Sequence, residues 1–594
     1  MKGSPDVIET EEDDDVGRVK RDQGGFVLPW MALMLLVLIA MAGFGVDVWN
    51  WWYTSQKVQR AADAGALAGV PFMPGNLNTT SPSATTTAVS VVQQNGYPSA
   101  TVAQGEKANQ LVVSVTETVN NYFTSLLGLN TTTITRSATA EFNAPVQMGS
   151  PVGHICNDPD NGGTDKEWCN IGAPGVDKHT GDRYADYTNC SSPTYLCTGT
   201  LNTEYLDSTY IYTIDLPTVP AGGVDIQVYD GEYANGAQNC DNQWLTAAQL
   251  TSLTATYPDA ATRYGTGQTG GYCTGDDNTN LGTPQATAWL VRTSAGSLFQ
   301  PLDPGNVVVS NGNVNNGGGA CAHQFLGYNP NSSSYWFNLL DPSNAAAQND
   351  PDFALSFHRW YSLCHVDTAG RYFVQVRSNV PQQSTSATRN SASVLESAQT
   401  PPSNTSIGGQ NRYSVRVVNT GTNNVTAGSA TYAQTRLPIY TNTTSSSTPN
   451  FFLARLVPGG VGSSTGRTLN LEFYDIGDVG GTTTLTVKPP TDATGSTISC
   501  SQWTFNGSSA NAAPSGSSFS GCVLSGITSA NYPGGFNGVL VNVKVNVPGD
   551  YNCTVADPNG CWFKIQMTYS SGAQANDTTT WSASIGGDPV RLIK

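Results

Sequence analysis

The side chains best suited to chemistry are carboxylates gathered in two short turns. They are Asp158, Asp160 and Asp165 in NDPDNGGTD, and Asp475 and Asp478 in YDIGD. Carboxylate and carbonyl oxygens that converge on one turn are the ligands that calcium prefers. Both turns are therefore candidate calcium sites, where the ion would rigidify a loop rather than catalyse a reaction. The alternative is that these are solvated turn residues, because neither turn has the EF-hand spacing.

The remaining motifs that resemble catalytic sites do not have the required context. GTGQTG at Gly265 runs toward Cys273 instead of opening a helix, as a nucleotide-binding loop would. GSSTG, with Ser464 at its centre, is expected to join two strands, whereas a nucleophile elbow joins a strand to a helix. The histidines do not form a metal or catalytic signature: His154, His179, His323, His358 and His365. We therefore expect neither an enzyme nor a cofactor other than calcium.

The cysteines indicate an oxidising compartment for most of the chain. All 12 lie between Cys156 and Cys561, and there is no C-x-x-C pair of the kind that zinc sites use. Disulfides are therefore expected, although sequence alone does not fix their connectivity. The closest pairs are Cys190 with Cys197, Cys500 with Cys522, and Cys553 with Cys561.

A single apolar segment near the N-terminus decides in which compartment these turns and cysteines lie. Residues 26–46 contain no charge, and about 20 such residues suffice to cross a membrane. Arg18, Lys20 and Arg21 precede the segment, so the positive-inside rule predicts a cytoplasmic N-terminus and an extracellular bulk. A cleaved signal peptide is the alternative, but the run is longer than a usual signal core and the helical pattern continues beyond it.

The helical pattern extends to about residue 69 and carries a face of small residues. An unbroken helix over residues 26–69 would be about 65 Å long. Trp49, Trp51, Trp52 and Tyr53 would form an aromatic belt at the outer interface. Small side chains permit close contact with another helix. The candidates for such association are Ala61, Ala62, Gly65, Ala68 and Gly69.

This N-terminal segment resembles a known family. An apolar helix, then Val46 and Asp47, then QRAADAGALAG over residues 59–69, is similar to the TadE/TadG-like proteins of tight-adherence (Flp-type) pilus assembly. The resemblance implies a pilin-like protein, anchored by one helix, that helps to build an adhesive surface fibre. Its partners would be other assembly proteins or copies of itself. Two features differ from relatives: Trp30 stands where a prepilin has glutamate after Gly25, and the metal motif of a von Willebrand A domain is missing.

The rest of the chain is predicted to be mainly β. Residues 1–25 form a cytoplasmic tail, and residues 26–70 form the transmembrane and extended helix. Residues 71–145, with QLVVSVTETV and TTTITRSATAEF as strands around a short helix in NYFTSLLGL, form a small pilin-like α+β unit. Alternating apolar segments and Gly, Asn and Pro turns then predict two β-sandwich domains, 146–425 and 426–594, the second closed by DTTTWSASIGGDPVRLI.

The two sandwiches show a weak internal duplication. YIYTIDLP and VDIQVYD, ending at Asp230, resemble FFLARLVPGG and TLNLEFYD, ending at Asp475. Downstream, GRYFVQV at Gly370 resembles GDYNCTV at Gly549. The separation between Gly370 and Gly549 is shorter than the separation between Asp230 and Asp475. This difference predicts an insertion near 231–330 in the first copy.

Composition limits the partners. The chain of 594 residues has a net charge of −17, which repels phosphate backbones and excludes sequence-independent nucleic-acid binding. The sequence therefore predicts a non-catalytic, membrane-anchored component of pilus assembly or surface adhesion. The alternative is a membrane-tethered carbohydrate-binding sandwich protein that contacts surface glycans, for which exposed Trp or Tyr on a sheet face would be the evidence.

Overall fold

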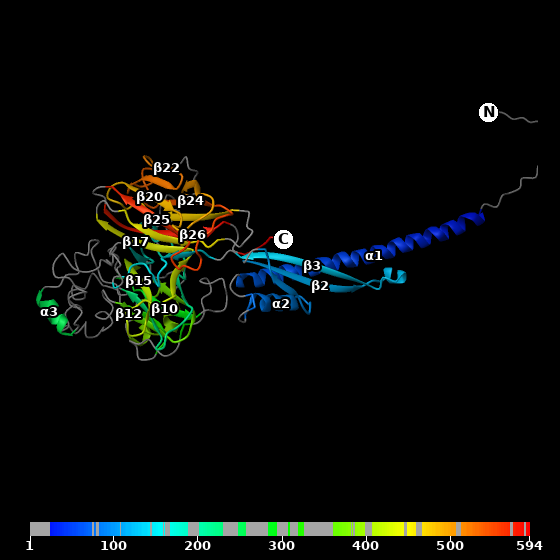
Figure 1. Cartoon of the computed structure of the whole chain (residues 1–594), viewed down its shortest axis with the longest axis horizontal. Helices are drawn as coiled ribbons and strands as arrows, with labels where there is room; N and C mark the ends of the chain where they lie inside the picture. Colours follow the sequence, from blue (N-terminus) through cyan, green and yellow to red (C-terminus); the bar gives the residue numbers. More distant parts are fainter. Residues whose placement is uncertain are drawn as a thin grey trace, which may run out of the picture.

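The computed structural model shows a mainly β protein with one long N-terminal helix (Figure 1), as predicted. It describes residues 24–73, 77–78, 82–106, 109–142, 145–158, 160, 167–187, 201–229, 247–256, 283–284, 286–293, 307–308, 319–325, 360–381, 383, 386–397, 407–444, 448–458, 466–506, 513–570, 574–586 and 590–593.

The helix α1 (Gly24–Gly69) is unbroken and projects from the rest of the molecule (Figure 1). Its 46 residues correspond to about 69 Å at 1.5 Å per residue. Leu, Met and Ala dominate its first half and favour the helical conformation. Pro29 lies in the second turn of α1, where its missing N–H removes only the hydrogen bond to the Gly25 carbonyl.

A small α+β unit packs on the second half of α1. Its sheet has the order β1-β2-β3-β27, and all its pairings are antiparallel. The elements are η1 (Val70–Phe72), α2 (Ala84–Gln94), β1 (Thr101–Gln104), β2 (Gln110–Asn120), η2 (Thr124–Leu127), β3 (Thr131–Phe142) and β27 (Val590–Leu592). The strands β2 and β3 and the short helix η2 lie where the sequence placed them.

Helix α2 was not predicted, because ATTTAVSVVQQ is rich in β-branched residues that disfavour helices. A capping box at its start, formed by Ser83 and Thr86, satisfies free backbone donors. Ala84, Ala88 and Val92, at intervals of four, are fully buried. Tertiary packing of this small apolar stripe against α1 therefore decides the helical state.

The sandwich consists of two large sheets whose pairings are all antiparallel. The first has the order β11 (Ala322–Gln324), β10 (Ala288–Thr293), β13 (Gly370–Arg377), β7 (Tyr210–Leu216), β16 (Ala430–Gln434), β4 (Gln147–Gly149), β18 (Asn450–Arg455), β25 (Trp562–Tyr569), β20 (Thr483–Lys488), β23 (Val523–Ile527) and β22 (Ser518–Ser520). The second has the order β12 (Trp360–Val366), β8 (Val224–Tyr229), β15 (Gln410–Asn419), β6 (Glu167–Gly172), β17 (Arg436–Thr444), β26 (Gln574–Ile585), β19 (Arg467–Tyr474), β24 (Leu540–Val547) and β21 (Ser499–Phe505), with β5 (His154–Ile155) beside β15.

Short elements complete the described fold. They are η4 (Lys178–Thr180), α3 (Ala247–Thr256), α8 (Ser386–Arg389), α9 (Ala392–Glu396) and the parallel pair β9 (Thr283–Pro284) and β14 (Ile407–Gly408). The predicted insertion near 231–330 lies largely outside the described residues.

One continuous core joins the two sheets along their whole length. The hydroxyls of Tyr212 on β7 and Tyr413 on β15 are 2.8 Å apart across the sandwich. Near the middle of the two sheets, the rings of Phe451 on β18 and Trp581 on β26 lie 5.6 Å apart. Both sheets run through the first lobe (β7, β8, β10 to β13 and β15) into the second lobe (β18 to β26). The two predicted sandwiches are thus lobes of one fused sandwich.

The duplication is visible in the strand pairing. In the first lobe β7 pairs with β13, and β8 pairs with β12 and β15. In the second lobe β18 pairs with β25, and β19 pairs with β24 and β26 in the same way. The expected match between the strand at Gly370 and the segment at Gly549 is wrong, since that segment is a loop and β25 takes the equivalent place. The partner of each strand depends on the order of strands in the whole sheet, so a short local sequence match does not identify equivalent strands.

The C-terminal end of the chain returns to the small unit. The expected closing strand is split: β26 lies in the sandwich, whereas β27 pairs with β3, where Val590 faces Phe142 and Leu592 faces Ala140. Figure 1 shows the C-terminus beside the start of the small unit. The sandwich is therefore tied to this unit by both of its ends.

Four disulfides hold the described part of the sandwich: Cys156–Cys169, Cys321–Cys364, Cys500–Cys522 and Cys553–Cys561. The last two are pairs expected from their spacing. The third expected pair, Cys190 with Cys197, lies outside the described residues. Each bridge stabilises the fold by roughly 2–4 kcal/mol through restriction of the unfolded chain.

Candidate functional site

The first half of α1 is apolar and almost fully exposed. Its residues from Val27 to Trp49 are exposed except for Gly43 and Asp47, which are buried. The helix is long and apolar enough to cross a membrane. Such a surface is unfavourable in water, so this half of α1 requires an apolar environment.

Asp47 is buried because a loop of the small unit closes over it. Its carboxylate accepts the backbone N–H groups of Tyr122 (2.7 Å), Phe123 (3.0 Å) and Thr124 (2.7 Å), and the hydroxyl of Thr124 (3.0 Å). These donors belong to the tip of the β2–β3 hairpin, residues 121–129. Charge-assisted bonds to three successive amides fix the tip against the helix.

Further polar contacts continue down the same face of α1. The indole N–H of Trp51 donates to Asn121 (2.8 Å), and the amide of Gln59 donates to the Ser137 carbonyl (3.3 Å). Between these contacts, Arg136 on β3 donates to the Ser55 hydroxyl (2.7 Å). Asp47, Trp51, Ser55 and Gln59 are spaced four residues apart, so they form one stripe along the helix. This polar stripe aligns the hairpin with α1.

The sequence did not reveal the polar stripe. In the sequence, Asp47 was noted only as part of the family resemblance, directly after Val46. A lone carboxylate at that place, together with the short apolar segment NYFTSLLGL, was the available signal. Only the fold brings residues 47 and 124 together.

The face of small residues is covered by the chain itself. Ala61, Ala62, Gly65 and Gly69 are buried, and Ala68 is half-buried. A Cβ on Gly65 would lie 2.7 Å from Val92 of α2, and one on Gly69 would lie 2.6 Å from the Ala84 carbonyl. The expectation that these residues associate with another helix is therefore corrected. Their small size lets α2 and β2 approach α1 within one chain.

Comparison with known proteins identifies this part of the chain. Residues 24–71 match the family model described as Putative Flp pilus-assembly TadE/G-like. The N-terminal segment is TadE/G-like. Neither the curated proteins nor the solved structures include a match to this chain.

The TadE/G-like match coincides with α1 and the first residues of η1. It therefore includes the apolar span, the polar stripe and the face of small residues, but not the sandwich. The family resemblance in AADAGALAG is thus carried by the residues that support the small unit.

In the first candidate calcium turn, two carboxylates form ion pairs with an arginine. Arg416 on β15 is buried, and its guanidinium lies 3.1 Å from Asp158 and 3.0 Å from Asp160. The guanidinium also lies over the ring of Trp360, 4.0 Å from its centroid. Asp165 lies outside the described residues. A calcium ion in this turn would have to compete with Arg416, so calcium here stays a prediction.

The second candidate turn places two carboxylates near each other. Asp475 is fully buried, and one of its carboxylate oxygens accepts the Gly538 N–H at 2.7 Å. Burial raises the pKa of the Asp475 carboxyl well above its usual value, and the nearby charge of Asp478 raises it further. Calcium at this turn also stays a prediction.

Within the described ranges, the one group of three side chains able to share a metal is Asp492 with Cys553 and Cys561. The two sulfurs are already bonded to each other. The motifs at Gly265 and Ser464 and the residue His358 lie outside the described residues.

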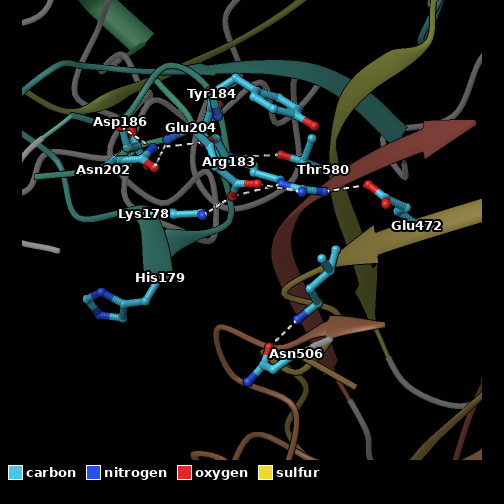
Figure 2. Close-up of polar contacts among 12 residues, drawn as sticks. Lys178, His179, Arg183, Tyr184, Asp186, Asn202, Glu204, Glu472, Asn506 and Thr580 are labelled. Carbon is cyan, nitrogen blue, oxygen red and sulfur yellow. Dashed lines mark hydrogen bonds and ion pairs between the residues drawn. The ribbon is translucent and has the colours of Figure 1, made fainter. Parts of the chain in front are cut away.

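A half-buried ionic cluster joins the two lobes. The guanidinium of Arg183, in the segment between β6 and β7, donates to both oxygens of Glu204 (2.6 and 3.1 Å) and to Glu472 on β19 (2.7 Å). Lys178 also donates to Glu204, and Thr580 on β26 accepts the Arg183 N–H. Figure 2 shows Arg183 reaching from this segment toward Glu472. The cluster holds the segment after β6 on the second lobe.

We expect Arg183→Ala to destabilise the sandwich by about 2 kcal/mol, because Glu472 loses its cation and Glu204 keeps only Lys178; the two carboxylates are 33% and 29% exposed, which screens part of the loss. The free energy of unfolding of the full chain in detergent, measured with urea, checks this. The matched control is Arg371→Ala. Arg371 pairs with Asp215, but the two side chains are 40% and 30% exposed, so we expect a loss of about 0–1 kcal/mol. Equal losses in both variants would contradict a special role of the cluster.

Asp475→Asn is expected to stabilise the protein at neutral and alkaline pH. The folded-state pKa of Asp475 is raised, so its stabilising contribution is present below the unfolded pKa and is lost as the pH rises through the folded value. The advantage of the variant should grow by up to about 1.4 kcal/mol per pH unit between those two values. Urea midpoints at a series of pH values, with Asp557→Asn in an exposed loop as control, provide the measurement. A variant less stable than wild type at high pH would refute this assignment.

Proposed function

We propose that this protein is a non-catalytic, membrane-anchored component of Flp-type pilus assembly, with α1 as its single span and the sandwich outside the cell. The observation that carries the proposal is the coincidence of the TadE/G-like match with a helix whose first half is apolar and exposed. In this role, α1 holds the protein in the membrane and the small unit carries the sandwich above it.

The proposed orientation is supported by charge and by sulfur chemistry. Arg18, Lys20 and Arg21 precede the span, and basic residues favour the cytoplasmic side. All cysteines follow the span, and the eight in described segments form disulfides, which persist in oxidising compartments.

A mechanical role is supported by the contacts of two described histidines, His323 and His365. His323 is buried beside Asn390, with 2.6 Å between the polar atoms. The two ring nitrogens of His365 face Asp225 (2.9 Å) and Asp367 (3.0 Å). Two carboxylates that hold both nitrogens favour a structural ion pair over a base that exchanges protons with a substrate.

The carbohydrate-binding alternative rests on exposed aromatic side chains on the sandwich. In the described strands, each tryptophan is buried or half-buried: Trp168, Trp289, Trp360, Trp503, Trp562 and Trp581. Among the described residues, the exposed Trp and Tyr side chains lie on α1 and the hairpin tip: Trp30, Trp49, Trp52, Tyr53 and Tyr122. This distribution favours a membrane belt over a glycan-binding face.

The test is complementation of a deletion strain of the native host. We expect the full chain to restore surface fibres, seen by electron microscopy, and to resist extraction from membranes by carbonate. A version with residues 1–46 replaced by a cleavable secretion signal should be exported but should not restore fibres. Fibres in the deletion strain, or full rescue by the released form, would refute the proposal. Protease added to intact cells should digest the sandwich but spare an epitope tag at the N-terminus.

A further inference from the structure

The hairpin tip exposes apolar side chains. Leu126 and Leu127 are 83% and 81% exposed, and Tyr122, Phe123 and Leu129 are exposed as well. The nearest charged residues along the chain are Glu117 and Arg136, so the tip itself is uncharged. A loop of this composition at the surface of a soluble domain would be unfavourable in water.

The tip lies beside the apolar span of α1 rather than beyond it. An apolar cavity of about 160 Å³ is lined by Ala40 and Phe44 of the span and by Phe123, Leu126 and Leu127 of the tip, with Thr124. A Cβ on Gly43 would lie 2.3 Å from the Phe123 ring. From Ala40 to Asp47 the helix rises about 10 Å, so the tip overlaps the last two turns of the apolar segment. Figure 1 shows the end of the β2–β3 hairpin lying along α1.

The backbone of the tip is internally hydrogen bonded. The Asp47 carboxylate accepts the N–H groups of residues 122–124. Within the tip, Leu126, Gly128 and Leu129 donate to the carbonyls of Phe123, Ser125 and Thr124. Paired backbone groups are the condition for a non-helical segment to enter hydrocarbon.

We propose that the hairpin tip inserts into the outer leaflet of the membrane beside α1 and is a second membrane contact of this protein. The proposal rests on the proposed function, because it takes α1 as the span. Leu126 and Leu127 enter the acyl region, and a lipid chain occupies the cavity. Tyr122, whose N–H donates to Asp47, and Trp49, two residues beyond Asp47, mark the interface. The two contacts together fix the tilt and rotation of α1, and so the direction in which the sandwich points.

Lipid is favoured over a second protein chain because the exposed surface is continuous. The tip lies at the same height along the helix axis as the exposed face of α1 at residues 40–46, and the two form one apolar region. A bilayer that surrounds the helix at this height must therefore also contact the tip.

The test uses the full chain in vesicles of phosphatidylethanolamine and phosphatidylglycerol. The photoreactive residue p-benzoylphenylalanine replaces Leu126, which is exposed enough to accept it without loss of the fold. The same residue replaces Leu36 in the span and Val457 on the second lobe in two matched controls, both exposed. After irradiation, mass spectrometry measures the phospholipid adducts. We expect at least about tenfold more lipid adduct at Leu126 than at Val457, because hydrocarbon does not reach a side chain in water.

The outcomes separate the two proposals. Lipid adducts at Leu36 but not at Leu126 would overturn the insertion of the tip and leave the span intact. A cross-linked protein dimer at Leu126, in place of lipid, would overturn it in favour of a contact between copies. If Leu36 also lacked lipid adducts, the span itself, and with it the insertion of the tip, would be wrong.

Discussion

Asp47→Ala is expected to release the hairpin tip from α1. Three backbone N–H groups and one hydroxyl lose a charged acceptor, and a hydrogen bond to a charged group contributes roughly 1.5–3 kcal/mol. Because losses in one network are not additive, we expect amide exchange that is faster by roughly 100-fold rather than by the product of four separate losses. Hydrogen–deuterium exchange of the full chain in nanodiscs measures this at residues 122–124.

The matched control is Asp63→Ala on the same helix. Asp63 accepts a hydrogen bond from Gln59 at 2.7 Å but does not hold the hairpin tip. We expect exchange at residues 122–124 to be unchanged in this control, and exchange at Val113 and Val115 in β2 to be unchanged in both variants. Slow exchange at the tip in Asp47→Ala would show that the apolar contacts alone hold it.

Ala62→Glu is expected to unfold the small unit, with a loss above about 4 kcal/mol. Ala62 is fully buried where α2 and the sheet pack on α1, and a carboxylate there would be both oversized and unpaired. The sandwich core is separate from this one, so we expect the sandwich to remain folded. Limited proteolysis followed by mass spectrometry should show new cleavage within residues 84–142.

Gln56→Glu provides the control, since it places the same side chain at an exposed position one to two turns away. We expect this variant to keep the wild-type proteolysis pattern. A stable small unit in Ala62→Glu that nevertheless failed to form fibres would instead revive lateral association through this face. Proteolysis thus measures the folding of the small unit separately from the formation of fibres.

Part of the fold was predicted from local patterns. The apolar run at residues 26–46 is long and apolar enough to cross a membrane, whatever follows it. Cys500 with Cys522 and Cys553 with Cys561 were close enough in sequence to be natural pairs. Cys321 with Cys364 could not be selected, because 43 residues separate them and only the sandwich brings β11 near β12.

The tertiary structure reassigned several residues whose patterns had been seen. Asp158 and Asp160 were read as possible metal ligands, but Arg416 supplies their positive partner from a strand more than 250 positions away. Sequence spacing gives no sign of such a contact. The same limit applies to Asp47 and the hairpin tip.

By itself, the sequence determined an apolar N-terminal helix, a TadE/G-like character for that segment and a mainly β remainder, since these depend on the composition and periodicity of neighbouring residues. Only the tertiary structure decided that the small residues of α1 pack against α2, that the two lobes share continuous sheets, and that β27 completes the small unit beside β3. These features depend on contacts between residues far apart in the chain, and their free energy arises from burial and hydrogen bonding that exist only once the fold has formed.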